Sequence, residues 1–296
     1  MKKIVSNIVI FAIFLLGICI FLYPMASNYL YEKASVKASY TYQEEIKKIT
    51  PEQIEAEEIE AQNYNASLYS NPVILTEPFA PDSWPVTDGA YGDMLDLTEE
   101  MAFIDIPKIN QKLPIYHGTT NAVLDKGVGH LENTSLPVGG PSTHSVLSAH
   151  RGLPKAELFT HLDKLDKGDI FTITVLNQKL AYEVYAIEVV EPKQVDSLYI
   201  QEGKDLVTLV TCTPYGVNSH RLLVHAERCE LPEDSVGATF DEGSFLISIA
   251  IVCLVALLLL LGFLIALLRK HKNQTRIAAN ADFDTYSRYS NNYRKK

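Results

Sequence analysis

Residues 208–216 read Thr-Leu-Val-Thr-Cys-Thr-Pro-Tyr-Gly, and this stretch decides how the middle of the chain is interpreted. An apolar run with β-branched residues ends at Cys212 and is followed at once by Pro214 and Gly216, which favour turns. Such a run, bounded by turn residues, is typical of a β-strand. The thiol of Cys212 is therefore predicted to stand at a strand end, where loops carry functional side chains.

A second β-like run, residues 222–226, begins directly after Arg221, nine residues beyond Cys212. The intervening residues 215–220 can form a loop that returns the chain as an antiparallel neighbour, which would bring the guanidinium near the sulfur. Only a thiolate attacks, and a neighbouring cation favours the charged form of a thiol whose ordinary pKa is about 8.5. Arg221 also offers fixed donors for an oxyanion.

His150 is the best-placed of the eight histidines to serve as an acid and base. It ends the strand-like run 145–148 and precedes Arg-Gly-Leu-Pro at 151–154, which turns the chain. Acyl transfer by a cysteine needs such a proton carrier. A lone cysteine is nevertheless often a small buried hydrophobe, and a lone histidine is often structural. The pattern alone leaves both interpretations open, and the structural one is adopted for His117, His130, His161, His220 and His225.

Short apolar or alternating runs separated by turn residues predict a mainly β domain over residues 101–232. They lie at residues 103–107, 145–148, 170–176, 180–190, 206–211 and 222–226. Many short strands in so few residues favour a closed barrel of about eight strands with short helices. The link 177–179 suits a hairpin, and residues 158–165 have a helix-like pattern.

Two uncharged stretches, residues 4–23 and 245–268, are each long enough to cross a bilayer. A hydrocarbon core about 30 Å thick needs roughly 20 apolar residues. A buried soluble helix is the alternative for either stretch. Residues 4–23 could also be a cleaved signal peptide, but their apolar run is longer than an ordinary signal core and no clear cleavage site follows. We expect an uncleaved anchor.

Positive charge flanks both apolar stretches on the side away from the barrel. Two lysines precede the first stretch, and eight Lys or Arg against two Asp follow the second. Because positive residues stay inside, both termini are predicted to be cytoplasmic and residues 24–244 extracytoplasmic, on a two-pass protein of the cell membrane. The net charge is −10, and removing the head's +2 and the tail's +6 leaves −18 outside, which disfavours nucleic acid as a partner.

The expected organisation therefore has eight parts. Thr50 before Pro51 is a plausible N-cap, so two short helices are expected between residues 28 and 66. The parts are a cytoplasmic head 1–3, a membrane helix 4–23, a helical stalk 24–70, a loop region 71–100, the barrel 101–232, a linker 233–244, a membrane helix 245–268 and a basic tail 269–296. With Cys19 and Cys253 inside the apolar stretches, a disulfide framework is not expected, although a Cys212–Cys229 bridge stays open.

Residues 208–212 resemble the TLxTC signature of sortases, with Arg221 at the spacing that this family uses for its arginine and His150 at the place of its histidine. Residues 129–145 are similar to the pilus subgroup, and the resemblance covers about residues 101–230. It implies a sortase-type barrel whose active residues are Cys212, His150 and Arg221. No cofactor is implied, and a metal site is not supported because His144 and His150 lack an HExxH or paired-cysteine arrangement.

What the resemblance implies is a cysteine transpeptidase on a Gram-positive cell surface. Cys212 would attack the Thr-Gly bond of an LPxTG-like sorting signal, and His150 would protonate the leaving amine. A lysine amine of another pilin subunit would then take the acyl group from the thioester, building a covalent pilus. Arg221 would stabilise the oxyanion or hold the carbonyl, and Thr211 would help to shape the substrate pocket.

Two apolar stretches and a long segment before the barrel are similar to class C, whose members carry a lid over the active site. The candidate lid is Asp82-Ser83-Trp84. The usual lid motif is Asp-Pro-aromatic, so Ser83 departs from it and loses the fixed φ of proline. By resemblance, Asp82 would pair with Arg221 and Trp84 would cover the sulfur of Cys212. The alternative is an ordinary proline-rich linker.

Three rival functions stay open. A sortase that anchors proteins to cell-wall peptide shares the first half-reaction and differs in the amine that it uses. A hydrolytic cysteine protease would release a free acid instead of an amide. A silent, membrane-tethered adhesion or scaffold module would not form an acyl-enzyme, and labelling of Cys212 by a thiol-reactive substrate analogue would count against it.

Overall fold

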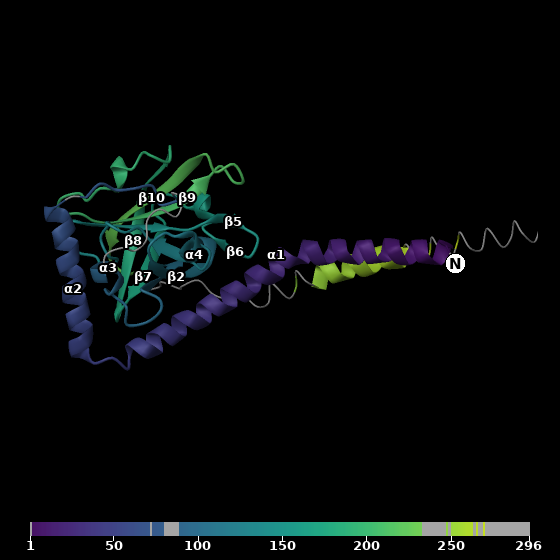
Figure 1. The fold of residues 1–296 in the computed structure, drawn as a ribbon, viewed down its shortest axis with the longest axis horizontal. Helices are drawn as coiled ribbons and strands as arrows, with labels where there is room; N and C mark the ends of the chain where they lie inside the picture. Colours follow the sequence, from purple (N-terminus) through teal and green to yellow (C-terminus); the bar gives the residue numbers. More distant parts are fainter. Residues whose placement is uncertain are drawn as a thin grey trace, which may run out of the picture. The chain divides into compact units, whose positions relative to one another are not determined.

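The computed structural model of the chain describes residues 2–71, 73–79, 89–232 and 250–262, together with positions 247, 265 and 269 (Figure 1). Within these ranges the side chains of residues 2–8, 11, 12, 15, 89 and 90 are outside the description. The chain divides into two compact units, Met1–Phe240 and Asp241–Lys296. The first contains the barrel, and residues 250–262 of the second are helical.

Eight strands form a closed barrel in the order β1-β2-β3-β4-β9-β10-β8-β7 (Figure 1). Their bounds are β1 Ala102–Ile106, β2 Gln111–His117, β3 Val128–His130, β4 Thr143–Ser148, β7 Ile170–Val175, β8 Gln178–Val190, β9 Asp205–Thr213 and β10 His220–Cys229. A separate hairpin is made of β5 (Arg151–Leu153) and β6 (Ala156–Leu158). The short helical elements are α3 Gly89–Gly92, η1 Pro107–Ile109, α4 Asn121–Leu124, η2 Leu162–Lys164 and η3 Asp196–Leu198.

Two strand pairs of the barrel, β2–β3 and β4–β9, are parallel, whereas the other pairs are antiparallel. A parallel pair cannot be closed by a tight turn and needs a crossover connection. The connection from β4 to β9 includes the β5–β6 hairpin, β7 and β8. This topology places the end of β4, and with it the residues before His150, beside the end of β9, which carries Cys212.

The predicted mainly β, closed barrel of about eight strands is confirmed, and six of its strands overlap the predicted runs. Strands β2 and β3 were not predicted, because Pro114 interrupts the alternation of one and the other has only three residues. The helix-like pattern over 158–165 was wrong: Leu158 has a positive φ that ends β6, and the only helical part is η2. The β7–β8 turn is Leu176-Asn177, which overlaps the predicted link 177–179 at Asn177.

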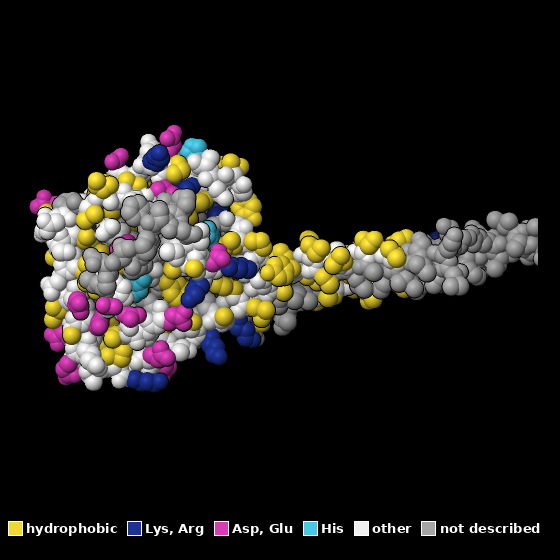
Figure 2. Space-filling model, viewed as in Figure 1, with side chains coloured by type: hydrophobic (Ala, Val, Ile, Leu, Met, Phe, Trp, Pro, Cys, Tyr) yellow, Lys and Arg dark blue, Asp and Glu magenta, His cyan; other side chains and the backbone are white. Residues whose placement is uncertain are grey.

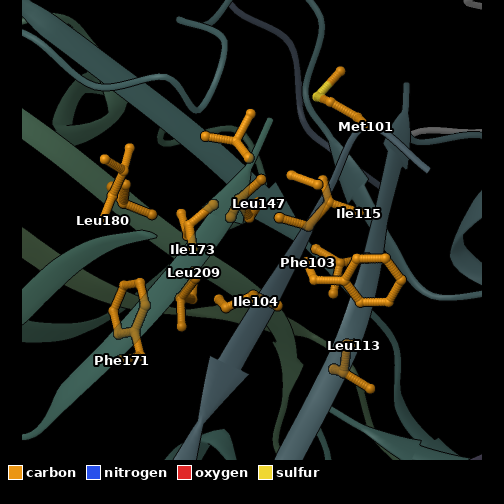
Figure 3. Packing of buried hydrophobic residues seen from close by; sticks show 14 of the residues in the cluster. Met101, Phe103, Ile104, Leu113, Ile115, Leu147, Phe171, Ile173, Leu180 and Leu209 are labelled. Carbon is orange, nitrogen blue, oxygen red and sulfur yellow. The ribbon is translucent and has the colours of Figure 1, made fainter. Parts of the chain in front are cut away.

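The interior of the barrel is filled by one large apolar cluster, part of which is shown in Figure 3. Side chains from strands around the barrel meet there, among them Ile104 of β1, Ile173 of β7 and Leu209 of β9, all fully buried. Because strand residues alternate between two faces, burying Leu209 inside turns its neighbours Thr208 and Val210 outward. The outer face of β9 therefore carries Thr208, Val210 and Cys212.

Helices α1 (Lys2–Ile46) and α2 (Pro51–Ser70) occupy the region in which two short helices were predicted. Thr50 caps α2 with a complete capping box to Gln53, as its place before Pro51 indicated. Helix α1 is not short, since it continues from the apolar stretch 4–23. Its later part packs on the barrel, where the Tyr42 hydroxyl donates to the Met101 carbonyl and accepts from the Leu176 amide.

The early part of α1 exposes apolar side chains, seen as yellow atoms in Figure 2. Among the described residues, Ile13, Leu16, Ile20 and Phe21 are each at least 60% exposed. No helix within the described part of the chain is both long enough and apolar enough to cross a membrane. Some side chains of 4–23, nine of the 24 residues of 245–268, the linker 233–244 and the basic tail beyond 269 lie outside the description.

Asn65 attaches α2 to the barrel domain. Its side-chain amide donates to the Leu136 carbonyl and its Oδ1 accepts from the Leu136 amide, and Asn65 itself is 2% exposed. Asn65→Ala is expected to lower the free energy of unfolding by about 2 kcal/mol, since it leaves two buried backbone groups unpaired. Urea unfolding of the full chain in detergent tests this, with the exposed Gln62→Ala as control. A loss below about 0.5 kcal/mol contradicts the attachment.

Candidate active site

Cys212 and Arg221 are direct cross-strand partners at one end of the β9–β10 pair. In an antiparallel pair, opposite residues have Cβ atoms about 5 Å apart on the same face of the sheet. Cys212 is 8% exposed. The predicted return of the chain after Cys212 is therefore confirmed, and it places the guanidinium-bearing residue beside the thiol-bearing one.

The register of β4 brings His150 level with Cys212. Ser148 pairs with Val210 in the parallel β4–β9 ladder, and the Ala149 amide donates to the Val210 carbonyl. His150 lies two residues beyond Ser148, and Cys212 lies two residues beyond Val210. Phe79 lies against both His150 and Arg221, and Arg221 is the cross-strand partner of Cys212, so His150, Cys212 and Arg221 form one row across three neighbouring chain segments.

Thr211 supports this row from the other face of β9. Its side chain is fully buried, and its hydroxyl donates to the Ala149 carbonyl at 2.8 Å. Neighbouring strand residues point to opposite faces, so Thr211 is directed away from the face that carries Cys212. The structure thus gives Thr211 a supporting contact to the residue before His150, and the pocket-shaping role that the resemblance implied stays a prediction.

The surroundings of the two titratable groups act against charge. Burial raises the pKa of the Cys212 thiol; Arg221 opposes that rise, and Glu77 adds to it. Burial lowers the pKa of His150, and the Asp125 carboxylate, whose Oδ1 lies 3.9 Å from Nε2, opposes the effect. The surroundings therefore favour the neutral thiol of Cys212 and the neutral imidazole of His150.

Residues 73–79, the covering segment, cross the row of candidate residues. Arg221 Nε donates to Glu77 Oε1 at 2.6 Å, and both side chains are mostly buried. Phe79 follows two residues later, with its ring centroid 5.1 Å from Arg221 Cζ and 5.9 Å from the His150 ring centroid. Pro78 between them is buried. The covering segment therefore occupies the space in front of Arg221 and His150.

Before it reaches Arg221, the covering segment lies in an apolar trough on the outer face of the barrel. Leu75 is 7% exposed and packs within a cluster separate from the barrel interior. The other buried members are Leu131, Val146, Leu198, Val210 and Leu223, with Phe79, Val190, Val195 and Tyr199 at the edge. A cavity of about 170 Å³ adjoins Leu75 and extends to Leu198 and Tyr199. The trough fits an extended chain with a buried apolar side chain.

Both thiols of the barrel are free. Cys212 pairs across the strands with Arg221, whereas Cys229 lies at the far end of β10 opposite Ala181 of β8, so the bridge left open by the sequence is not formed. Among the described residues, no group of three or more His, Cys, Asp or Glu side chains is arranged to hold a metal ion.

Comparison with known proteins relates this chain to a family. The sortase domain model matches residues 104–229, which contain Cys212, His150 and Arg221. Sortase D of Bacillus subtilis is 30% identical over 128 residues, covering 42% of this chain and 62% of its own length. Sortase A of Streptococcus agalactiae is 32% identical over 142 residues, covering 47% and 56%. The chain thus spans less than two thirds of the length of these curated relatives.

Solved structures match over a larger share. Sortase C-1 of Actinomyces oris is 51% identical with a TM-score of 0.59, and the match covers 61% of this chain and 100% of that one. Sortase C of Streptococcus pneumoniae, whose description mentions pilin substrate specificity, is 44% identical with a TM-score of 0.62, covering 66% and 97%. The chain belongs to the sortase family. Within the family, it is a class C sortase.

The covering segment of this sortase contacts Arg221, the residue that the resemblance paired with Asp82. Asp82, Ser83 and Trp84 lie outside the described residues, so their lid role stays a prediction, and among the described carboxylates Glu77 pairs with Arg221. Glu77-Pro78-Phe79 also keeps the acidic-Pro-aromatic order of a lid, which Asp82-Ser83-Trp84 breaks at Ser83. Glutamate has one more methylene than aspartate, so the backbone of the covering segment can reach Arg221 from farther away.

Sequence reasoning missed Glu77 and Phe79 because it required aspartate and favoured the chain's one tryptophan. The signal was nevertheless present, since an acidic residue, proline and an aromatic residue stand in order at 77–79. Asp125 was also missed. It is the residue at the end of α4, 25 residues before His150, and no local pattern connects the two.

Glu77→Gln is expected to increase alkylation of the Cys212 thiol at neutral pH several-fold. Removing the carboxylate takes away a charge that raises the thiol pKa and breaks the ion pair that holds the covering segment, and each unit of pKa changes the thiolate fraction about tenfold. Iodoacetamide labelling followed by mass spectrometry of the Cys212 peptide measures this. Glu60→Gln on α2 is the control. An unchanged rate in Glu77→Gln contradicts the protection.

Proposed function

We propose that the chain is a cysteine transpeptidase that joins pilin subunits through isopeptide bonds. One observation carries the proposal: Cys212, His150 and Arg221 lie in one row at the end of an apolar trough, beneath an acidic-Pro-aromatic segment. The family match over residues 104–229 and the likeness to sortases C support the same reaction. Water alone could also accept the acyl group, so the amine acceptor is part of the proposal.

In the first half-reaction the Cys212 thiolate attacks the threonine carbonyl carbon of an LPxTG-like signal. A C–S bond forms, the Thr-Gly C–N bond breaks, and His150 gives its proton to the leaving glycine amine. Arg221 donates to the oxygen that gains negative charge. The products are a thioester on Cys212 and a released peptide that begins with glycine.

In the second half-reaction a lysine amine of another pilin attacks the thioester carbonyl. His150 accepts the proton of that amine, the C–S bond breaks, and Cys212 leaves as a thiolate, so atoms and charges balance without a cofactor. The covering segment must leave the row first, since Glu77 holds Arg221 and Phe79 lies against His150. The trough around Leu75 suits the leucine of the signal, because both are apolar side chains on an extended chain.

A two-pass arrangement in the cell membrane is part of the proposal, with both termini cytoplasmic and the barrel outside. The uncharged stretches 4–23 and 245–268 and the positive residues that flank them support it. The exposed apolar side chains early in α1 support it too, since bilayer burial would remove them from water. Protease digestion of intact cells tests this topology: cleavage of the tail beyond 269 from outside would refute it.

The deciding experiment mixes the full chain in detergent with one pilin that ends in an LPxTG-like signal and another that supplies a lysine. Mass spectrometry of the product separates the candidate functions. An amide between the two pilins supports the proposal. Release of the free threonine acid despite excess acceptor pilin indicates a hydrolase. Coupling only to a cell-wall peptide, offered in a parallel reaction, indicates an anchoring sortase. No conversion indicates an adhesion or scaffold module. Enzyme alkylated at its thiols is the control.

A further inference from the structure

The outer face of β9 and β10 carries three successive rows of side chains. Cys212 faces Arg221 in the first row, and Val210 faces Leu223 in the second, within the trough. The third row, Thr208 and His225, is polar although both residues are nearly inaccessible, with exposures of 0% and 4%. This row lies four residues from the first, about 13 Å along the strands.

The third row is the middle of a continuous chain of polar contacts that crosses four strands. The Tyr199 carbonyl lies 3.0 Å from His144 Nδ1, and His144 Nε2 lies 2.7 Å from the Thr208 hydroxyl. That hydroxyl lies 2.8 Å from His225 Nδ1, and His225 Nε2 lies 3.1 Å from Glu188 Oε1. We call His144, Thr208, His225 and Glu188 the polar relay.

Both ends of the polar relay hold the same segment, the β8–β9 loop at residues 191–204. One end is the Tyr199 carbonyl. At the other end the Glu188 carboxylate accepts a hydrogen bond from the Ser197 side chain. Ser197 lies in η3 and Tyr199 follows that helix directly, so the relay fixes one short stretch of the loop from two sides.

The polar relay depends on the hydroxyl group of Thr208. The Tyr199 carbonyl and the Glu188 carboxylate only accept, so neutral His144 donates from Nδ1 and neutral His225 donates from Nε2. Burial lowers the pKa of His144 to about 4 and also lowers that of His225, which keeps both rings neutral near pH 7. Each ring then turns a bare nitrogen toward Thr208. Its hydroxyl carries one proton, so it donates to one ring at a time, and its oxygen lies between the two rings.

The loop stretch fixed by the relay is a wall of the trough. Leu198 is buried in the same cluster as Leu75, and Tyr199 packs at its edge. The Tyr199 hydroxyl accepts a 3.4 Å hydrogen bond from the Leu75 amide, and the adjoining cavity is lined by Leu198, Tyr199 and His144. A peptide that replaces the covering segment in the trough would meet this wall.

We propose that the polar relay is a positioning device for substrate: it holds residues 197–199 in place, so that the trough is shaped before a sorting peptide binds. This inference rests on the proposed function, because it takes the trough to be the peptide site. Side chains about 13 Å from Cys212 do not touch the reacting atoms. Loss of the relay therefore weakens peptide binding without changing the chemical step.

Thr208→Val keeps the volume of the side chain and removes its hydroxyl, whereas Thr208→Ser keeps the hydroxyl and serves as the conservative rescue. Glu188→Ala tests the Glu188 end of the polar relay, and because this side chain is 42% exposed the substitution carries less risk to folding. Glu183→Ala on the same strand is its control. With the full chain in detergent, Thr208→Val and Glu188→Ala are each expected to raise KM for a sorting peptide about tenfold with kcat unchanged, the loss of one or two hydrogen bonds. Thr208→Ser and Glu183→Ala are expected to match the parent.

Hydrogen exchange at the amides of residues 197–199 gives a readout that does not depend on activity. Faster exchange at these amides in Thr208→Val and Glu188→Ala, with the rest of the barrel unchanged, supports the positioning role even if no peptide is cleaved, in which case only the proposed function fails. Unchanged exchange in folded Glu188→Ala overturns the inference. A fall in kcat at constant KM also overturns it, because it would place the relay in the chemical step.

Discussion

Cys212→Ala is expected to abolish both cleavage of the sorting peptide and formation of the isopeptide bond, to below detection. The reaction needs a thiolate at the strand end beside Arg221, and no other described cysteine can replace it: Cys229 lies at the opposite end of β10. Alanine removes the sulfur without altering the backbone of β9, so peptide binding in the trough should persist. Product mass spectrometry and equilibrium peptide binding measure the two effects separately.

Cys229→Ala is the matched control for Cys212→Ala, because Cys229 is the other free thiol of the barrel. Its activity is expected to equal that of the parent chain. Residual isopeptide formation by Cys212→Ala above that of thiol-alkylated enzyme would show that Cys212 is not the nucleophile. Loss of peptide binding in the same variant would show that the sulfur also shapes the trough.

Arg221→Ala is expected to lower kcat by about 10²–10³-fold with a smaller change in KM, as for removal of an oxyanion donor. Arg221 is the cation beside Cys212, and its Nε is bound to Glu77 while NH1 donates to the Asn218 and His220 carbonyls. These backbone contacts hold the guanidinium at the end of β10. In the proposed mechanism Arg221 acts on the substrate only after Glu77 has released it.

Arg221→Ala should be measured in a Glu77→Gln background, so that loss of the ion pair is not counted as loss of catalysis. Arg221→Lys in the same background separates charge from geometry, since lysine keeps the charge but lacks the planar fork. We expect Arg221→Lys to stay within about tenfold of Arg221→Ala. Full activity in Arg221→Lys would mean that charge alone matters, and full activity in Arg221→Ala would exclude Arg221 from the mechanism.

Much of the active row could be predicted from the sequence. The β9 and β10 runs are separated by a short turn, and an antiparallel return of this kind leaves few registers, so Cys212 and Arg221 were expected to meet. His150 could be proposed as a strand-end residue, but its place beside Cys212 depends on the parallel β4–β9 register. No local pattern encodes that register, because 62 residues separate the two side chains.

The mainly β barrel, the strand-end thiol and the arginine next to it could be predicted from the sequence, because alternation, turn residues and short loops act over neighbouring positions. The contact between Glu77 and Arg221 and the contacts that hold the β8–β9 loop appear only in the folded chain. Glu77 lies before the barrel, and no local pattern connects it with Arg221. The relay from Tyr199 to Glu188 joins residues of four strands, and its members come together only when the barrel closes.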